Sequence, residues 1–155
     1  MFASKSDYKA VFFVDAGSDY GLSHFIRSLE IARCFSFENN EILFLLQETD
    51  KVNKLITEKG YNHLTVYKRD VEDEIAGRNP LILITDLREN NTINWKKLRR
   101  ENIFIVSIDD LSRSYLESDI VFNPNLFSED IKYEYVPEEV PIYRGTKYFI
   151  FRMVI

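Results

Sequence analysis

Four short runs of this 155-residue chain are apolar at almost every position, and they constrain the fold more than any other feature. The runs cover residues 11–14, 42–46, 81–85 and 103–108. A strand with one face in water carries polar residues at alternate positions, whereas these runs are apolar on both faces. Such strands occur in parallel sheets that helices cover on both sides. We therefore predict an α/β fold.

Helical patterns separate these runs. Apolar residues recur at helical spacing at Leu22, Phe25, Ile26, Leu29 and Ala32. Other helices are expected from Asp50 to Gly60 and over 68–74, 92–100 and 112–116, and weaker strands over 63–67 and 120–122. Residues 127–144 show no period and predict a loop. The apolar residues 148–155 predict either a buried final strand or a boundary between domains.

Alternating strands and helices joined by right-handed crossovers place the carboxyl ends of all strands on one edge. We predict a Rossmann-like, mostly parallel sheet with helices on both faces, and the strand at 11–14 near its centre. The length suits one α/β domain over residues 1–155. The high hydrophobic content, 45%, supports a packed core.

Charge, cysteine content and the length of the apolar runs exclude several classes of protein. The net charge of −5, with no basic stripe, argues against a nucleic-acid partner. The single cysteine, Cys34, gives neither a disulfide framework nor a thiolate metal site, which favours a cytoplasmic location. No apolar run approaches the ~18 residues that a membrane span needs.

The loop between the first run and the first helix holds the first candidate site residues. In an open α/β sheet, ligands bind beyond the carboxyl end of such a strand. The polar residues of this stretch are Asp15, Ser18, Asp19, Ser23 and His24, with Gly17 and Gly21 between them. These positions are candidates for catalysis and substrate binding.

Polar residues also follow the later strands and are expected to converge on the same edge. They are Asp86, Asp109, Asp110, Asn123 and Asn125. A single aspartate at a strand end is more often a cap or a turn former, so the cluster carries more weight than its members.

His24 is the candidate general base. It lies in the first turn of the expected helix, where the helix dipole favours the neutral imidazole that a base requires. The alternative is a structural histidine in a helix-entry loop. His63 borders a peripheral strand and is expected to be structural or exposed to solvent.

Several signatures are missing. The sequence has no P-loop, no Gly-x-Gly-x-x-Gly pattern and no nucleophile elbow. The two histidines lie far apart and the spacing of possible ligands matches no metal site, so we expect chemistry without metal or cofactor.

The ordered motifs of the chain resemble the UDP-diacetamido-trideoxy-altropyranose hydrolases of the pseudaminic acid pathway, which are close to spore coat polysaccharide glycosyltransferase-like proteins. That family has a Gly-x-Gly-His loop before a helix with Arg and Leu. The matching segments here are Gly21-Leu22-Ser23-His24 with Arg27-Ser28-Leu29, Asp86, Val106 to Asp110, Asp119 to Asn125 and Gly145 to Arg152. Ser23 departs from the pattern because the family has a second glycine there.

The resemblance implies the N-terminal half of a two-domain arrangement like that of GT-B glycosyltransferases. In this arrangement the second domain binds most of the nucleotide, and this half binds the sugar of a UDP-linked amino sugar. His24 would activate water at the anomeric carbon, and Asp15 or Asp19 would orient it. Substrate contacts would come from Gly17, Ser18, Asp19, Gly21, Ser23, Arg27, Asp86, Asp109 and Asn125.

Two other functions remain open at this point. The same fold could transfer the sugar to an acceptor hydroxyl instead of water. The serine at position 23 also keeps open a non-catalytic domain that binds or regulates within a sugar pathway. We expect the 155-residue chain alone to bind UDP poorly and to turn over little substrate.

Overall fold

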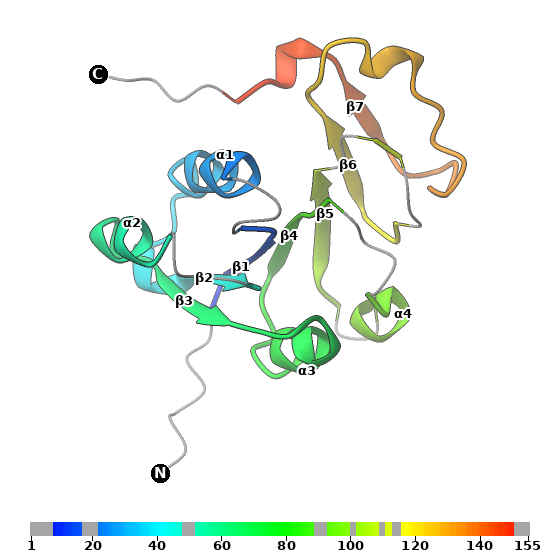
Figure 1. Ribbon diagram of the computed structural model, residues 1–155. Coiled ribbons are helices and arrows are strands. Elements are labelled where there is room, and N and C mark those ends of the chain that lie inside the picture. Colours follow the sequence, from blue (N-terminus) through cyan, green and yellow to red (C-terminus); the bar gives the residue numbers. More distant parts are fainter. Residues whose placement is uncertain are drawn as a thin grey trace.

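The computed structural model describes residues 8–16, 22–47, 52–88, 93–99, 102–108, 111–112 and 116–150. In these residues, one sheet of seven parallel strands has helices on both faces (Figure 1). The strands are β1 (Ala10–Val14), β2 (Ile42–Leu46), β3 (Asn62–Thr65), β4 (Ile82–Asp86), β5 (Phe104–Ile108), β6 (Ile120–Asn123) and β7 (Ile142–Arg144). The α-helices are α1 (Ser23–Ala32), α2 (Asn53–Glu58), α3 (Val71–Ala76) and α4 (Trp95–Leu98). This confirms the predicted Rossmann-like α/β fold.

The strand order places β1 inside the sheet. The order is β3-β2-β1-β4-β5-β6-β7, so β1 pairs with β2 on one side and with β4 on the other. The chain winds outward from β1 in one direction through β3 and then in the other direction from β4. The point between β1 and β4 is therefore the topological switch point, where open α/β sheets bind ligands.

Alternation along the strands divides the core into two layers. On one face, Phe12 of β1 stacks on Phe44 of β2 with ring centroids 4.8 Å apart, below Phe25 of α1. On the other face, Phe13 of β1 packs in the layer that contains Trp95 of α4. Figure 1 shows α1 and α2 on the first side of the sheet and α3 and α4 on the second. Both faces of β1 are thus dry, as its apolar sequence requires.

One strand lies where the sequence predicts a loop. β7 (Ile142–Arg144) pairs in parallel with β6. The Tyr143 ring stacks on Phe122 of β6 at 5.2 Å, and Gly145, with φ of +98°, ends the strand. The three residues between Pro141 and Gly145 are too few to show a period, so pairing with β6 decides their conformation.

Other expectations at the carboxyl-terminal part need correction. A helix does not begin at Ser112, because its φ is +51°, and Leu116 is also irregular; residues 113–115 lie outside the described ones. Tyr148 ends a 3₁₀ helix and Phe149 is 48% exposed, so no buried strand begins there, while residues 151–155 lie outside the described part.

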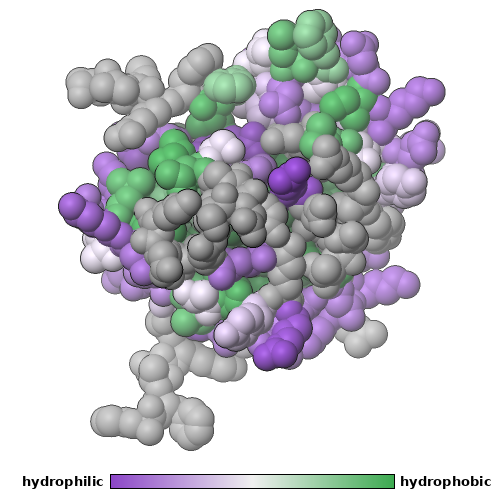
Figure 2. All heavy atoms as spheres, in the orientation of Figure 1, coloured by the Kyte–Doolittle hydropathy of each residue, from purple (hydrophilic) through white to green (hydrophobic). Residues whose placement is uncertain are grey.

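Figure 2 shows hydrophobic side chains at the upper end of the molecule, near the region where Figure 1 places β7.

The remaining elements lie close to their expected positions. The third strand, β3, forms an edge of the sheet, as its weak alternation predicts. The expected helix over 68–74 is a 3₁₀ turn followed by α3. The helix expected over 92–100 is described only as the short α4, with Trp95 and Leu98 buried.

Candidate functional site

The amino-terminal end of α1 lies at the switch point and carries three polar residues toward the end of β4. His24 is the second residue of α1, and Arg27 and Ser28 follow three and four positions later. Residues at this spacing share one face of a helix. The contacts below show that this face is turned to the last residue of β4, Asp86.

Asp86 is the centre of the site. Its carboxylate is fully buried, and His24 Nδ1 lies 2.6 Å from Oδ1. Arg27 donates from Nη2 to Oδ1 at 2.6 Å and from Nε to Oδ2 at 2.8 Å. Ser28 adds a longer hydrogen bond from Oγ to Oδ2 at 3.5 Å. Both carboxylate oxygens therefore have partners from α1, and Arg27 binds in the bidentate mode that fixes geometry best.

The arrangement defines which nitrogen of His24 can act as a base. A buried carboxylate needs a counter-charge, and the always-charged guanidinium of Arg27 provides one. An ionised carboxylate can only accept, so Nδ1 of the neutral imidazole must carry the proton and donate it to Oδ1 of Asp86. The lone pair is then on Nε2, the nitrogen that accepts a proton. The 3.4 Å approach of Arg27 Nη2 to Nδ1 follows because both donors share Oδ1.

Asp15 is the first residue after β1, one position beyond the partner of Asp86, and it has different hydrogen-bond partners. Its carboxylate is also fully buried, and it accepts from Gln47 Nε2 at 2.6 Å and from the backbone N–H of Arg88 at 2.8 Å. Its own backbone N–H donates to the carbonyl oxygen of Asp86 at 3.1 Å. Asp15 therefore ties together the segments that follow β1, β2 and β4.

A pocket of about 330 Å³ adjoins Arg27. It is lined by Ser23, Ile26, Arg27, Glu30, Pro124, Asn125, Phe149 and Ile150. The pocket combines hydroxyl, amide and charged groups with apolar walls, which is the composition of a small-molecule site. Asn125 is held in place by Asn123, whose Oδ1 accepts from both the backbone and side-chain nitrogens of Asn125 at 3.2 Å.

The structure thus brings together several residues that the sequence predicts for the site. His24, Arg27 and Asp86 are in direct contact, and Ser23 and Asn125 line the pocket beside them. His63 lies on the edge strand β3, where its side chain is half-buried. Gly17, Ser18, Asp19, Gly21, Asp109 and Asp110 lie outside the described residues.

Three further residues of this region were not singled out from the sequence. Ser28 is four positions after His24, so helical spacing could have identified it. Gln47 directly follows a buried strand, the same signal that identified Asp86. Glu30 lines the pocket and pairs with Arg33 at 2.7 Å, and no sequence signal distinguishes it from other surface acids.

Two kinds of feature are not found in the part of the chain that the structure describes. It holds no group of three His, Cys, Asp or Glu side chains arranged for a metal ion. None of its helices has the length and apolar character that crossing a bilayer requires.

Fold and site together define a doubly wound α/β protein with a histidine–aspartate–arginine cluster at its switch point. No protein family matches the chain, and no curated protein matches it.

Proposed function

We propose that this chain forms the sugar-binding half of a nucleotide-sugar hydrolase that releases UDP from a UDP-linked amino sugar. The observation that carries the proposal is the 2.6 Å contact between His24 Nδ1 and the buried Asp86, at the switch point and next to Arg27, which lines a pocket of about 330 Å³. The motif resemblance supports the choice of substrate.

In the proposed reaction, His24 is the catalytic residue and Asp86 positions it. Nε2 of His24 takes a proton from water as the water oxygen bonds to the anomeric carbon. The bond from that carbon to the β-phosphate oxygen breaks, and UDP leaves with the bonding electrons. Asp86 holds the ring in the productive tautomer and stabilises the imidazolium that forms, as carboxylates do in catalytic triads.

Arg27 acts through Asp86 in this proposal. Its guanidinium makes two hydrogen bonds to the carboxylate, so its charge is largely used inside the protein and is poorly suited to cradle a diphosphate. The net charge of −5 also disfavours an anionic ligand. The nucleotide is therefore assigned to a second domain, in agreement with the resemblance.

The test is incubation of the protein, at its full natural length, with UDP-linked acetamido sugars. Free UDP and free reducing sugar are measured with and without sugar acceptors. We expect both products without an acceptor. UDP release that depends on an acceptor would indicate a transferase, and an unchanged substrate would indicate a binding domain; either result contradicts hydrolysis.

The two histidines provide a matched pair of variants. His24→Asn should lower turnover by roughly 10²–10⁴-fold while nucleotide affinity stays nearly constant, because a general base acts in the transition state. His63→Asn is the control and should leave turnover unchanged. Wild-type turnover in His24→Asn would exclude His24 as the base.

A further inference from the structure

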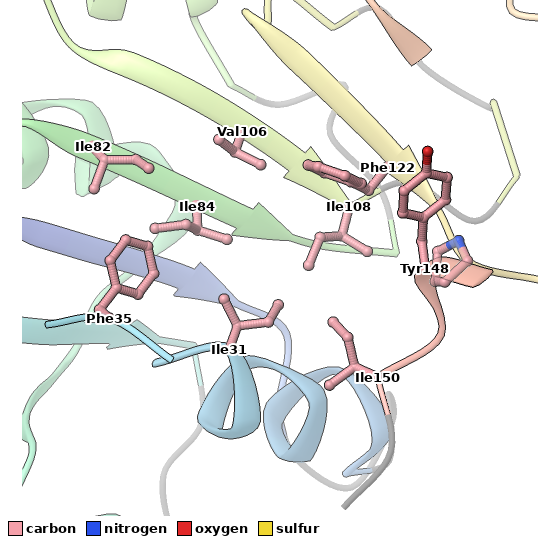
Figure 3. A pocket seen from close by; sticks show the side chains of 10 residues that line it. Ile31, Phe35, Ile82, Ile84, Val106, Ile108, Phe122, Tyr148 and Ile150 are labelled. Atoms are coloured by element: carbon pink, nitrogen blue, oxygen red, sulfur yellow. The ribbon is translucent and has the colours of Figure 1, made fainter. Parts of the chain in front are cut away.

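An apolar groove runs from the candidate site along the α1 side of the sheet. Figure 3 shows side chains of β4, β5, β6, α1 and the segment after β7 pointing into one space. Its lining is Ile31, Phe35, Ile82, Ile84, Val106, Ile108, Phe122, Pro124, Tyr148 and Ile150. Its volume is about 340 Å³, within the range of ligand pockets and over twice the ~150 Å³ cavity that takes up benzene.

The two faces of β4 to β6 differ in coverage. On the α3 and α4 side, Leu83, Ile105 and Val121 are completely buried. On the groove side, Val106 and Phe122 are only half-buried. Ile84 and Ile108, which also line the groove, are buried, so the open part of this face lies at Ile82, Val106 and Phe122.

The strand β4 leads from the groove directly to the reacting centre. Ile82, Ile84 and Asp86 alternate along it, so their side chains share one face. The first two line the groove, and the third contacts His24. Two residues of a strand span about 6.6 Å, so the lining changes from the hydrocarbon of Ile84 to the carboxylate of Asp86 over that short distance.

The helix α1 and the segment that follows it repeat this change in the same direction. Arg27 contacts Asp86, whereas Ile31 and Phe35, four and eight residues later, line the groove. Pro124 and Ile150 belong to both the groove and the polar pocket that Arg27 lines. The pocket and the apolar groove therefore adjoin at these two residues.

We propose that the groove binds the aliphatic chain of the substrate, an amino sugar whose nitrogen carries a long acyl group. The sugar lies in the pocket that Ser23 and Arg27 line, and the acyl chain runs along β4 toward Ile82. This inference rests on the proposed function for the identity of the head group. It adds the chemical class of the substituent, which neither the motifs nor the polar residues specify.

The test compares two ligands with the same head, N-octanoylglucosamine and N-acetylglucosamine. Each is titrated into the 155-residue chain with ¹³C-labelled isoleucine methyl groups, below the concentration at which the longer ligand forms micelles. We expect saturable shifts at Ile31, Ile82 and Ile84 and none at Ile75 and Ile105, which lie in the opposite core layer. The octanoyl ligand should bind at least about 100-fold more tightly, because each buried methylene adds to affinity.

A pair of tryptophan variants tests the location. Val106→Trp fills the groove and should abolish the preference for the longer ligand, whereas Leu64→Trp on the edge strand β3 should preserve it. Equal affinity for the two ligands, shifts that include Ile75 and Ile105, or full binding by Val106→Trp would overturn the inference. Shifts that depend on protein concentration without ligand would also overturn it, since the groove would then join two copies.

The result is separable from the proposed function. His24→Asn should keep the octanoyl preference, because the groove does not involve the base. Hydrolysis of UDP-linked acetamido sugars without any gain from a longer acyl chain would remove the inference and leave the function. An octanoyl preference without hydrolysis would remove the function and leave the groove.

Discussion

Asp86 is the last residue of β4 and Asp15 directly follows the neighbouring strand β1; both carboxylates are fully buried, yet their surroundings differ in kind. Asp86 receives hydrogen bonds from Arg27 and contacts the imidazole of His24. Asp15 receives amide hydrogen bonds from Gln47 and from the backbone of Arg88. Burial at the switch point therefore does not assign a role to a carboxylate; its hydrogen-bond partners do. A charged and titratable set suits catalysis, and an amide set suits the joining of loops.

Substitution of each carboxylate by its amide gives the largest expected difference in activity. Asp86→Asn can present an amide N–H to Nδ1 and favour the wrong tautomer of His24, so turnover should fall by roughly 10⁴-fold. Asp15→Asn should keep turnover within several-fold. Product formation measures the rate, and ¹⁵N chemical shifts of the His24 ring report the tautomer. A greater loss in Asp15→Asn would give Asp15 the orienting role.

Truncation to alanine should separate the two carboxylates in stability. Asp86→Ala leaves the partly buried guanidinium of Arg27 without its counter-charge, and we expect a loss of about 3–5 kcal/mol. Asp15→Ala leaves neutral amide donors without an acceptor and should cost about 1–3 kcal/mol. Urea unfolding measures both. Equal losses would show that the two sites are energetically alike.

The bidentate geometry at Asp86 can be tested by a change that preserves charge. Arg27→Lys keeps the cation but removes one of the two hydrogen bonds, for a loss of about 1.5–3 kcal/mol. Arg33→Lys, in an exposed pair of the same helix, is the matched control and should change unfolding by less than about 1 kcal/mol. Similar values for the two variants would remove the special role of the bidentate pair.

The smallest effect is expected at the ion pair between Lys9 and Glu41, which lies just before β1 and β2 at the amino ends of the strands, away from the site. The hydrogen bond from Lys9, at 2.6 Å, and then that from the Glu38 backbone lower the pKa of Glu41 from its ordinary value of 4.5. A lowered pKa in the folded state stabilises the fold above the unfolded pKa, and this stability is lost as pH falls through the folded value. Glu41→Gln should therefore flatten the stability curve slightly below pH 4.5, as measured by urea unfolding across pH.

Much of the fold follows from the sequence because the faces of a strand that are buried carry apolar residues, and this pattern is visible within the strand itself. The strand at 11–14 is apolar on both faces, so a central place in a parallel sheet is its only dry environment. The weak alternation of 63–67 likewise matches the exposed edge strand β3. The apolar pattern does not predict β7, because its three residues are partly exposed and pairing with β6 decides their conformation.

For the site, the sequence by itself determined that polar residues follow the strands at one edge and that His24 opens the first helix. It did not determine which carboxylate faces His24, because that depends on strand order and on the side to which each side chain turns. Val14 and Asp86 are paired across β1 and β4, and Asp15 is one residue further on. A shift of one residue reverses the face of the sheet. Only the tertiary structure sets the register of β1 against β4 and the place of α1 on the sheet. As a result, Asp86 contacts His24 and Arg27, whereas Asp15 accepts a hydrogen bond from Gln47.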